Sequence, residues 1–140
     1  MSGDCVFCRI LRHELPAAFV YEDDDVAAFL DLYPVNRGHT LVVPKAHAAD
    51  LMTCPVETAA RLFRVSTALA PAVVAAVGAE GFNVWTANGR VAGQTVFHLH
   101  LHILPRFRTD TFGLRFPKNY PQEASRAELE EMAAAIRARA

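Results

Sequence analysis

The sequence predicts an α+β domain in which an antiparallel sheet of about five strands packs against one long helix, with a second helix near the C-terminus. Short segments with strand periodicity follow one another through short turns or through a single helix. The segment from Pro55 to Gly78 has helical spacing instead. The chain has 140 residues, of which 52% are hydrophobic, so residues 1–140 are expected to form one domain around a core.

The N-terminal half is expected to contain a short helix and three strands. The stretch CVFCRILRHELP is typical of a helical turn that stops before Pro16. Strands are expected at residues 18–22, 26–31 and 40–44. The acidic turn at residues 23–25 joins the first two strands as a hairpin, and the loop at residues 33–39, with its Pro, Asn and Gly, precedes the third.

The C-terminal half is expected to contain both longer helices and the last two strands. Pro55 suits the first turn of the long helix, whereas Pro71 must kink that helix or split it. Strands are expected at residues 81–87 and 94–104, with a glycine-containing loop at residues 88–93 between them. Ser125 and Glu128 form a capping box before AELEEMAAAIRA, which has the pattern of a solvated amphipathic helix.

The composition argues against several classes of protein. The net charge of −1 argues against a broad nucleic-acid surface. We recognise no apolar run of spanning length and no signal peptide, so neither membrane insertion nor export is expected. Of the three cysteines, Cys5 and Cys8 form C-x-x-C and Cys54 stands alone. This pattern predicts a reducing, cytoplasmic location rather than a disulfide framework.

The stretch HLHLHIL carries three histidines at alternate positions, His98, His100 and His102. Alternate side chains of a strand share one face, so the three imidazoles are expected to point the same way, with the outer two about 13 Å apart at Cα. The alternative is a half-exposed strand that merely contains histidines. Three on one face favour a functional site, because imidazole titrates near neutral pH and binds metals.

Two kinds of chemistry use such a row. An H-x-H pair with a third ligand can hold catalytic zinc, and a neutral imidazole can attack phosphorus to form a covalent intermediate. In the preceding loop, Gly89 and Gly93 allow close backbone approach to a ligand, while Gln94 and Thr95 supply an amide and a hydroxyl. Such neutral donors suit phosphate oxygens better than a metal, although an ordinary glycine turn is the alternative explanation of this loop.

Together these motifs resemble those of the histidine triad (HIT) family. HLHLHIL matches the pattern His-φ-His-φ-His-φ-φ, where φ is apolar, and the flanking AGQTVFH and PR are similar too. The resemblance extends to CVFCRIL, to AFLDLYPVNRGHTLVVPKAH and to the capped C-terminal helix, so it covers nearly the whole chain. It is greatest to the Hint-like branch of nucleotide hydrolases, whose bacterial members often carry C-x-x-C, and it implies a HIT-like fold.

The resemblance implies a catalytic group of five residues. His100 would attack the α-phosphorus of a nucleotide and form a nucleotidyl-histidine, from which water releases the nucleoside monophosphate. His102 would lie against the phosphate oxygens and the leaving group. His39 matches a fourth family histidine that supports the site, and Gln94 and Thr95 match contacts to the phosphate and the leaving group.

The resemblance also implies a nucleotide-binding surface. Asp31 matches the acidic residue that takes the ribose hydroxyls, a role that suits a carboxylate, although a solvated aspartate at a strand end is the alternative. The apolar slot for the base matches Val6, Phe7, Ile10, Phe29 and Leu32. Ala87 departs from the pattern, since many relatives have Asn or Gln there, and Asn88 is the candidate substitute. The proline-containing segment 107–123 lies where relatives shape leaving-group specificity.

A second constellation joins the C-x-x-C motif to two histidines. Two thiolates at this spacing can grip one zinc ion. In C-x-x-C members of the HIT family the first triad histidine and the histidine after Pro-Lys also bind zinc, which implies a structural site of Cys5, Cys8, His47 and His98. This site would hold the N-terminal turn to the sheet and leave His100 free. Two small buried cysteines without a metal are the alternative.

These expectations combine into one functional hypothesis. The sequence predicts a cytoplasmic hydrolase or transferase that acts on phosphoramidates or dinucleoside polyphosphates of purine nucleosides and contains structural zinc. The resemblance implies a homodimer, with an apolar helix and an edge strand at the interface. One alternative is a zinc-dependent hydrolase with the metal on the triad, which chelation would inactivate. The other is a nucleotide-binding adaptor with little turnover, which would not release AMP from a phosphoramidate.

Overall fold

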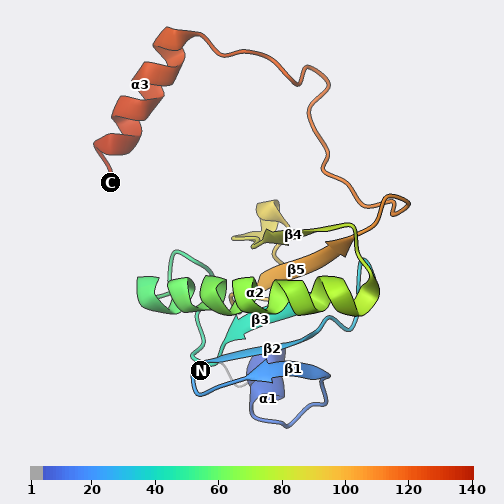
Figure 1. Cartoon of the computed structure of the whole chain (residues 1–140). Coiled ribbons are helices and arrows are strands. Elements are labelled where there is room, and N and C mark those ends of the chain that lie inside the picture. Colours follow the sequence, from blue (N-terminus) through green and yellow to red (C-terminus); the bar gives the residue numbers. More distant parts are fainter. Residues whose placement is uncertain (1–4) are drawn as a thin grey trace.

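A computed structural model of the chain describes residues 5–140 as a five-stranded antiparallel sheet with three α-helices (Figure 1). The elements in chain order are α1 (Val6–Leu11), β1 (Phe19–Glu22), β2 (Val26–Leu30), β3 (Thr40–Pro44), α2 (Val56–Val77), β4 (Gly81–Trp85), the 3-10 turn η1 (Arg90–Ala92), β5 (Leu101–Arg106) and α3 (Arg126–Arg137). The strands lie in the order β1-β2-β3-β5-β4, so β1 and β4 are the edges of the sheet. The predicted fold class is confirmed.

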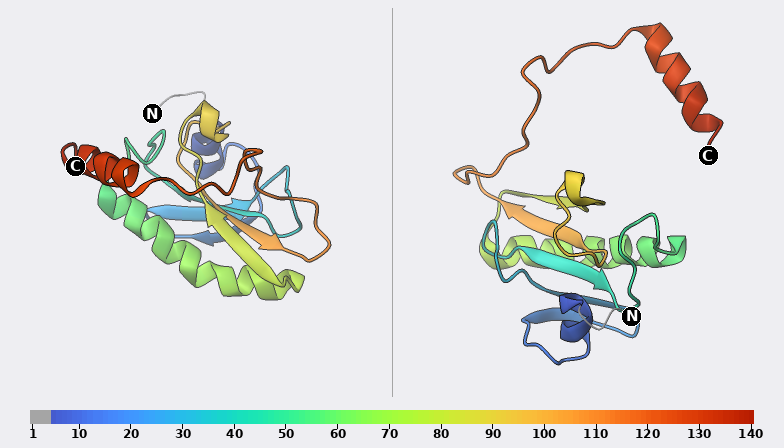
Figure 2. Two further views of the ribbon diagram at one scale, coloured as in Figure 1. Left: turned by 90° about the horizontal axis from the view of Figure 1, so that it is seen from above. Right: turned by 180° about the vertical axis from the view of Figure 1, so that it is seen from behind.

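Helices cover both faces of the sheet, α2 on one face and α1 on the other (Figure 2). Strand periodicity sends alternate residues to the two faces. The core under α2 includes Val26, Ala28, Val42, Leu62, Val65, Leu99, Leu101 and Ile103. The core on the α1 side is built from Phe7, Ala27, Phe29, Leu41 and Val43. The short helix α1 is therefore held against the sheet chiefly by Phe7.

The long helix α2 runs unbroken through Pro71 and ends at Gly78, whose φ of 65° is the left-handed conformation of a helix C-cap. The expectation that Pro71 could split the helix is therefore wrong. By length and composition α2 could also cross a membrane, with a mean hydropathy of 1.4, so the expectation that the chain has no apolar run of spanning length needs correction. In this fold α2 lies along the sheet and buries Leu62 and Val65 there.

The last strand is shorter than predicted, because β5 begins at Leu101 and residues 94–100 are irregular. In this segment, hydrogen bonds to the last residue of β3 and to the loop after it take the place of sheet hydrogen bonds. The Leu99 N–H donates to the carbonyl of Ala48 at 2.7 Å, and the imidazole of His98 lies 2.8 Å from the carbonyl of Pro44. The alternation of faces survives without the strand, since Leu99 and Leu101 both lie in the core under α2.

The C-terminal quarter of the chain, residues 107–140, leaves the end of β5 and extends beyond the β4 edge; we call it the arm (Figures 1 and 2). It ends in α3, which stands clear of the sheet and of α2 in Figure 1 and in the right panel of Figure 2. The predicted capping box is present, with the Ser125 hydroxyl accepting from the Glu128 N–H and the Glu128 carboxylate accepting from the Ser125 N–H.

Candidate active site and metal centre

The three histidines of the HLHLHIL stretch lie on the α1 side of the sheet, around Phe7. The ring of Phe7 meets His98 and His100 edge-on, with centroid distances of 5.9 and 5.2 Å. The rings of His100 and His102 are 4.8 Å apart. His98 and His100 are buried, and His102 is partly exposed. The predicted row of imidazoles is therefore present, although only His102 belongs to the strand itself.

Backbone hydrogen bonding fixes the tautomer of His100. Its Nδ1 lies 2.7 Å from the carbonyl oxygen of His98, which can only accept, so Nδ1 carries the proton and Nε2 keeps its lone pair. Burial lowers the pKa of His100, against the opposing effects of that carbonyl and of Asp31. The ring is thus neutral near pH 7 and presents an unprotonated nitrogen, which is the form that acts as a nucleophile.

A second chain of hydrogen bonds orients His102 as a donor. The backbone N–H of Val35 donates to Nδ1 of His39 at 3.2 Å, so the proton of His39 lies on Nε2. That Nε2 lies 2.9 Å from Nδ1 of His102, which must accept, and the proton of His102 therefore lies on Nε2. Burial lowers the pKa of His102 to about 3, assisted by His100 and His39, and burial also lowers the pKa of His39. A nitrogen lone pair on His100 thus stands beside an N–H donor on His102.

Trp85 contacts this group and was not foreseen from the sequence. It lies opposite His102 in the β4–β5 register, and its indole stacks on the imidazole with a centroid distance of 4.5 Å and an interplanar angle of 8°. Phe112, in the arm, stacks on the indole at 5.9 Å. A tryptophan in the predicted strand 81–87 was the available signal, but the long link to the histidines left the strand register undetermined.

Asp31 lies beside the histidines at the end of β2. One carboxylate oxygen is 3.7 Å from Nδ1 of His39, and the other accepts a hydrogen bond from the Tyr33 N–H at 2.9 Å. The side chain of Asp31 is 21% exposed, so part of the carboxylate is accessible to a ligand. Asp31, His39 and His102 also offer ligand atoms within 4.8 Å of one another, an arrangement that could hold a metal ion.

The residues upstream of the histidines divide into buried and exposed ones. The amide nitrogen of Gln94 donates to the carbonyls of Ala49 and Val96 at 2.6 and 3.1 Å, and its oxygen accepts from the Gly89 N–H. Both donor hydrogens of Gln94 are thereby used, so in this conformation Gln94 holds the loop together and offers no donor to phosphate. Thr95 is exposed.

Asn88 also binds backbone, because its side-chain oxygen accepts from the Leu51 N–H at 2.8 Å. The residues matched to a base slot are distributed unevenly. Phe7 and Phe29 are buried in the core at 7% and 2% exposure, and Ile10 packs against them. Val6 and Leu32 are exposed. Phe7 and Phe29 therefore support the site from beneath.

Cys5, Cys8, His47 and His98 converge at the start of α1, with ligand atoms all within 4.8 Å. The two cysteine sulfurs lie 3.4 Å from the nearest imidazole nitrogen, and the Nδ1 atoms of the two histidines are 3.1 Å apart. Around a tetrahedral zinc ion, a sulfur and a nitrogen ligand lie about 3.5 Å apart and two nitrogens about 3.3 Å apart. The four side chains therefore fit one such ion.

A carbonyl of the sheet orients the metal-facing nitrogen of His98. Nε2 of His98 donates to the Pro44 carbonyl at 2.8 Å, which leaves Nδ1 unprotonated and directed at the cysteines. Burial lowers the pKa of His98 to about 4, and burial raises the pKa of the Cys8 thiol. Cys54 is buried outside this cluster.

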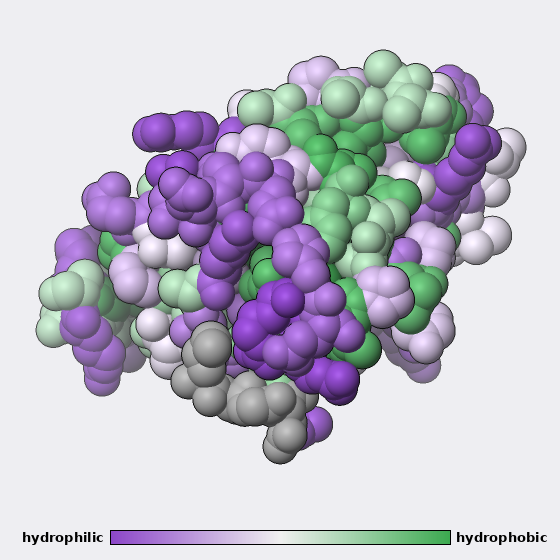
Figure 3. Space-filling model, turned by 90° about the horizontal axis from the view of Figure 1, so that it is seen from below, coloured by the Kyte–Doolittle hydropathy of each residue, from purple (hydrophilic) through white to green (hydrophobic). Residues whose placement is uncertain are grey.

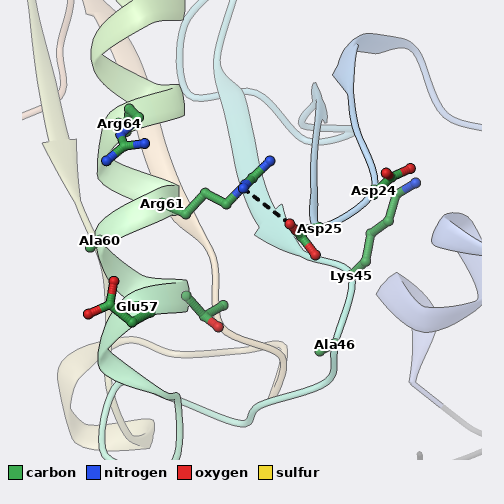
Figure 4. A pocket seen from close by; sticks show the side chains of 9 residues that line it. Asp24, Asp25, Lys45, Ala46, Glu57, Ala60, Arg61 and Arg64 are labelled. Atoms are coloured by element: carbon green, nitrogen blue, oxygen red, sulfur yellow. Dashed lines mark ion pairs between the residues drawn. The ribbon is translucent and has the colours of Figure 1, made fainter.

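A separate charged pocket of about 400 Å³ lies between α2 and the β1–β2 hairpin and contains none of the predicted site residues (Figure 4). Two of its basic side chains form ion pairs. Arg61 contacts Asp23 and Asp25 at 3.1 and 3.2 Å, and Lys45 contacts Glu22 at 2.9 Å. The ion pairs of Arg61 therefore join α2 to the hairpin.

Known proteins resemble this chain in sequence. The family model described as "HIT domain" matches residues 12–109. An "Adenosine 5'-monophosphoramidase" of Schizosaccharomyces pombe is 39% identical over 73% of this chain and 74% of its own length. An "Adenylylsulfatase" of Arabidopsis thaliana is 40% identical over 79% of this chain and 56% of its own length.

Solved structures resemble it in fold. A crystal structure from Streptococcus mutans UA159 has a TM-score of 0.93 and 40% identity, and covers 99% of this chain and 87% of that one. Because the arm is about a quarter of the sequence, such a score over nearly the whole chain requires the arm to lie in nearly the same place in both proteins. A "ZN-bound" histidine triad family protein from Mycobacterium smegmatis has a TM-score of 0.76 and 38% identity over 96% of this chain and 99% of its own.

Proposed function

Because the chain belongs to the HIT family, we propose that it is a nucleotide hydrolase or transferase that cleaves at the α-phosphate through a nucleotidyl intermediate on His100. The substrates proposed are phosphoramidates and dinucleoside polyphosphates of purine nucleosides. The two relatives named as an adenosine 5'-monophosphoramidase and an adenylylsulfatase support this choice of substrate class.

One observation carries the proposal: the hydrogen bond from Nδ1 of His100 to the carbonyl of His98. This bond leaves the lone pair on Nε2 and orients the ring from behind. A general base is then unnecessary, because the nucleophile is already unprotonated at pH 7. The neighbouring N–H of His102 would donate to the phosphate or to the leaving group, where negative charge develops.

The proposed reaction has two steps. In the first, Nε2 of His100 forms a bond to the α-phosphorus while the bond from phosphorus to the leaving amine or phosphate breaks, and the leaving group takes the proton of Nε2 of His102. In the second, water attacks the phosphorus of the nucleotidyl-histidine, the bond to Nε2 of His100 breaks, the water returns a proton to Nε2 of His102, and the nucleoside monophosphate is released. His100 returns to its neutral form, so the residue is unchanged over the cycle.

We propose that Cys5, Cys8, His47 and His98 hold a structural zinc ion. When bound, the metal supplies a cross-link between the start of α1 and the segment before β5. The metal would help to position His100 without touching the substrate. The ring of His98 faces the metal, and the backbone carbonyl of His98 accepts the hydrogen bond from His100. The "ZN-bound" relative supports this assignment.

The protein is further proposed to act as a homodimer. The support is the unpaired edge strand β4 and the apolar groove of about 590 Å³ between β4 and α2, which contains the exposed Phe63 and Phe82. An apolar strand edge left open would pair with other chains indiscriminately, and a specific interface removes that hazard. A second copy would cover both the edge and the groove.

Rapid-quench mass spectrometry with adenosine 5'-phosphoramidate tests the proposal. Wild-type protein stopped during turnover should carry an acid-labile adenylyl group on the peptide that contains His100. His100→Ala should bind AMP and lose turnover, whereas His13→Ala, which removes an exposed histidine of another loop, should react normally. Near-wild-type turnover by His100→Ala would contradict the assignment of the nucleophile.

The alternative function is a zinc-dependent hydrolase with its metal on the triad, and the cluster of Asp31, His39 and His102 is the observation that favours it. Chelation separates the two reactions, because a covalent histidine mechanism should survive metal removal as long as the fold does. A parallel assay of one phosphoramidate and one dinucleoside tetraphosphate then assigns the preferred substrate, and the absence of AMP release from both would favour an adaptor.

A further inference from the structure

The helix α3 has an apolar stripe that packs against no other element of residues 5–140. Leu129, Met132 and Ile136 follow the spacing of one helix face and are 49%, 59% and 61% exposed. Glu131 lies on the opposite face. A helix with one apolar stripe gains most of its stability from packing that stripe against another element. Within the described part of the chain, this stripe therefore stays uncovered.

The arm nevertheless leaves the domain in a defined direction. Asp110, whose side chain is only 6% exposed, accepts two hydrogen bonds of 2.8 Å from the guanidinium of Arg106 at the end of β5. The amide of Asn36 donates to the same carboxylate at 2.9 Å. The arm also lies in nearly the same place as its counterpart in the Streptococcus mutans structure, so the two proteins share its projection away from the sheet.

An apolar groove lies near the opposite edge of the sheet, away from β4. It has a volume of about 410 Å³ and runs between α2 and the β1–β2 edge. Apolar side chains from both elements line it, among them Val20, Leu30, Leu69 and Val73. Figure 3 shows the hydrophobic surface that gathers there. Arg37 also lines the groove, and Glu128 lies in the first turn of α3, so the charges are complementary.

The stripe and the groove of one chain lie at opposite edges of the sheet. In Figure 1, α3 projects beyond β4, whereas β1 and β2 lie at the far edge. Two copies joined antiparallel along their β4 edges are related by a two-fold axis beside β4. That operation carries the β1–β2 side of the second copy to the side on which α3 of the first copy projects.

We propose that the arm crosses to a second copy of the chain, where the stripe of α3 packs into the groove between α2 and the β1–β2 edge, and that the second copy returns the same contact. The inference rests on the proposed homodimer and not on the proposed reaction. It explains three features together: the exposed stripe, the open groove, and the fixed projection of an arm that leaves its own domain.

Cross-linking between two differently tagged, co-expressed chains tests the exchange. One chain carries Met132→Cys and the other Leu30→Cys, both at exposed positions, and a short bis-maleimide joins the thiols. We expect a cross-linked pair containing both tags. The matched pair with Glu131→Cys in place of Met132→Cys should give several-fold less product, and the wild-type pair corrects for the native cysteines.

Two outcomes of the cross-linking would overturn the proposal. One is equal product from the Met132→Cys and Glu131→Cys pairs. The other is a cross-link within a single chain that carries both cysteines, at high dilution, which would mean that α3 folds back onto its own groove.

Sedimentation velocity provides a second test that does not depend on catalysis. The wild-type chain should be a dimer at micromolar concentration. Met132→Glu should raise the dimer dissociation constant at least tenfold, while Glu131→Gln should leave it unchanged, with both variants folded by circular dichroism. A monomeric wild-type chain, or equal dissociation constants for the two variants, would overturn the proposal and would leave the His100 chemistry to be judged by its own test.

Discussion

The indole ring of Trp85 lies flat on the imidazole of His102, with ring centroids 4.5 Å apart and ring planes 8° apart. The contact follows from the sheet, because the two residues are directly opposed on β4 and β5. The hydrogen bond from His39 then fixes the rotation of the imidazole within that plane. A small set of neighbours thus determines where the N–H of His102 points.

Trp85→Leu should therefore lower kcat more than it changes KM for a phosphoramidate. A stacked aromatic pair contributes about 0.5–1.5 kcal/mol beyond its buried area, which corresponds to a roughly 2–10-fold loss of rate. Trp85→Phe keeps a ring at this position and should recover most of the activity. Steady-state kinetics of the three proteins checks this, and an unchanged kcat for Trp85→Leu would show that the stack does not orient His102.

Asp31→Ala should weaken binding of a nucleoside monophosphate by roughly 1–3 kcal/mol, the cost of losing hydrogen bonds to a charged group. A 2′-deoxynucleotide should be affected much less, because it lacks one of the two hydroxyls. Calorimetric titration of both ligands into both proteins measures the difference. Asp31→Asn, which keeps an acceptor for the Tyr33 N–H, controls for changes in the loop. Equal losses for the two ligands would exclude the ribose role.

Removal of the metal should reduce the stability of the fold. Cys8→Ser is expected to abolish binding of about one zinc ion per chain and to lower the melting temperature, by about 2–8 °C for each kcal/mol lost. Cys54→Ser alters a buried cysteine outside the cluster and should keep its zinc. Elemental analysis and thermal unfolding of freshly purified proteins make the comparison. Zinc-free wild-type protein whose stability Cys8→Ser leaves intact would refute the structural site.

The stability of the fold should decrease as the pH falls below about 6.5. The usual pKa of His102 is 6.5, and burial lowers its pKa to about 3 in the folded protein. Between these values the unfolded chain binds a proton at His102 and the folded chain does not, so acid favours unfolding. Urea unfolding at pH 7.5 and 5.5 should show a smaller loss of stability for His102→Asn than for wild type. Identical losses would mean that His102 is not buried as the neutral form.

The sequence predicted those parts of the molecule that depend on local periodicity. The alternation of HLHLHIL placed leucines and histidines on opposite faces, and the capping box marked the start of α3. The sequence alone could not predict the hydrogen bonds of Gln94, because both acceptors of its amide nitrogen are backbone carbonyls that only the folded loops bring near. The same alternation predicted a strand from residue 94, but residues 94–100 are not part of β5. The backbone of this segment forms hydrogen bonds with a neighbouring loop, such as that from the Leu99 N–H to the Ala48 carbonyl.

Features that depend on long-range register were not predictable. The pairing of Trp85 with His102 requires the exact offset between two strands separated by a long loop, and alternation alone leaves several offsets equivalent. The helix of the arm was foreseen, but its position was not, because nothing in its own pattern states which surface it meets. The convergence of Cys5, Cys8, His47 and His98 was inferred from the family resemblance, and spacing alone did not determine it.

The stretch from His98 to Ile103 makes folding and chemistry depend on the same count of residues. Its leucines supply the core under α2, and its histidines supply the nucleophile, its neighbouring donor and a metal-site residue. Inserting or deleting a single residue here would exchange the two sets, directing imidazoles into the apolar layer and leucines toward the substrate. Surface loops tolerate insertions and deletions, but in this stretch a length change would disrupt both the core and the site. Surface loops could therefore change in length over evolution while this segment kept its own.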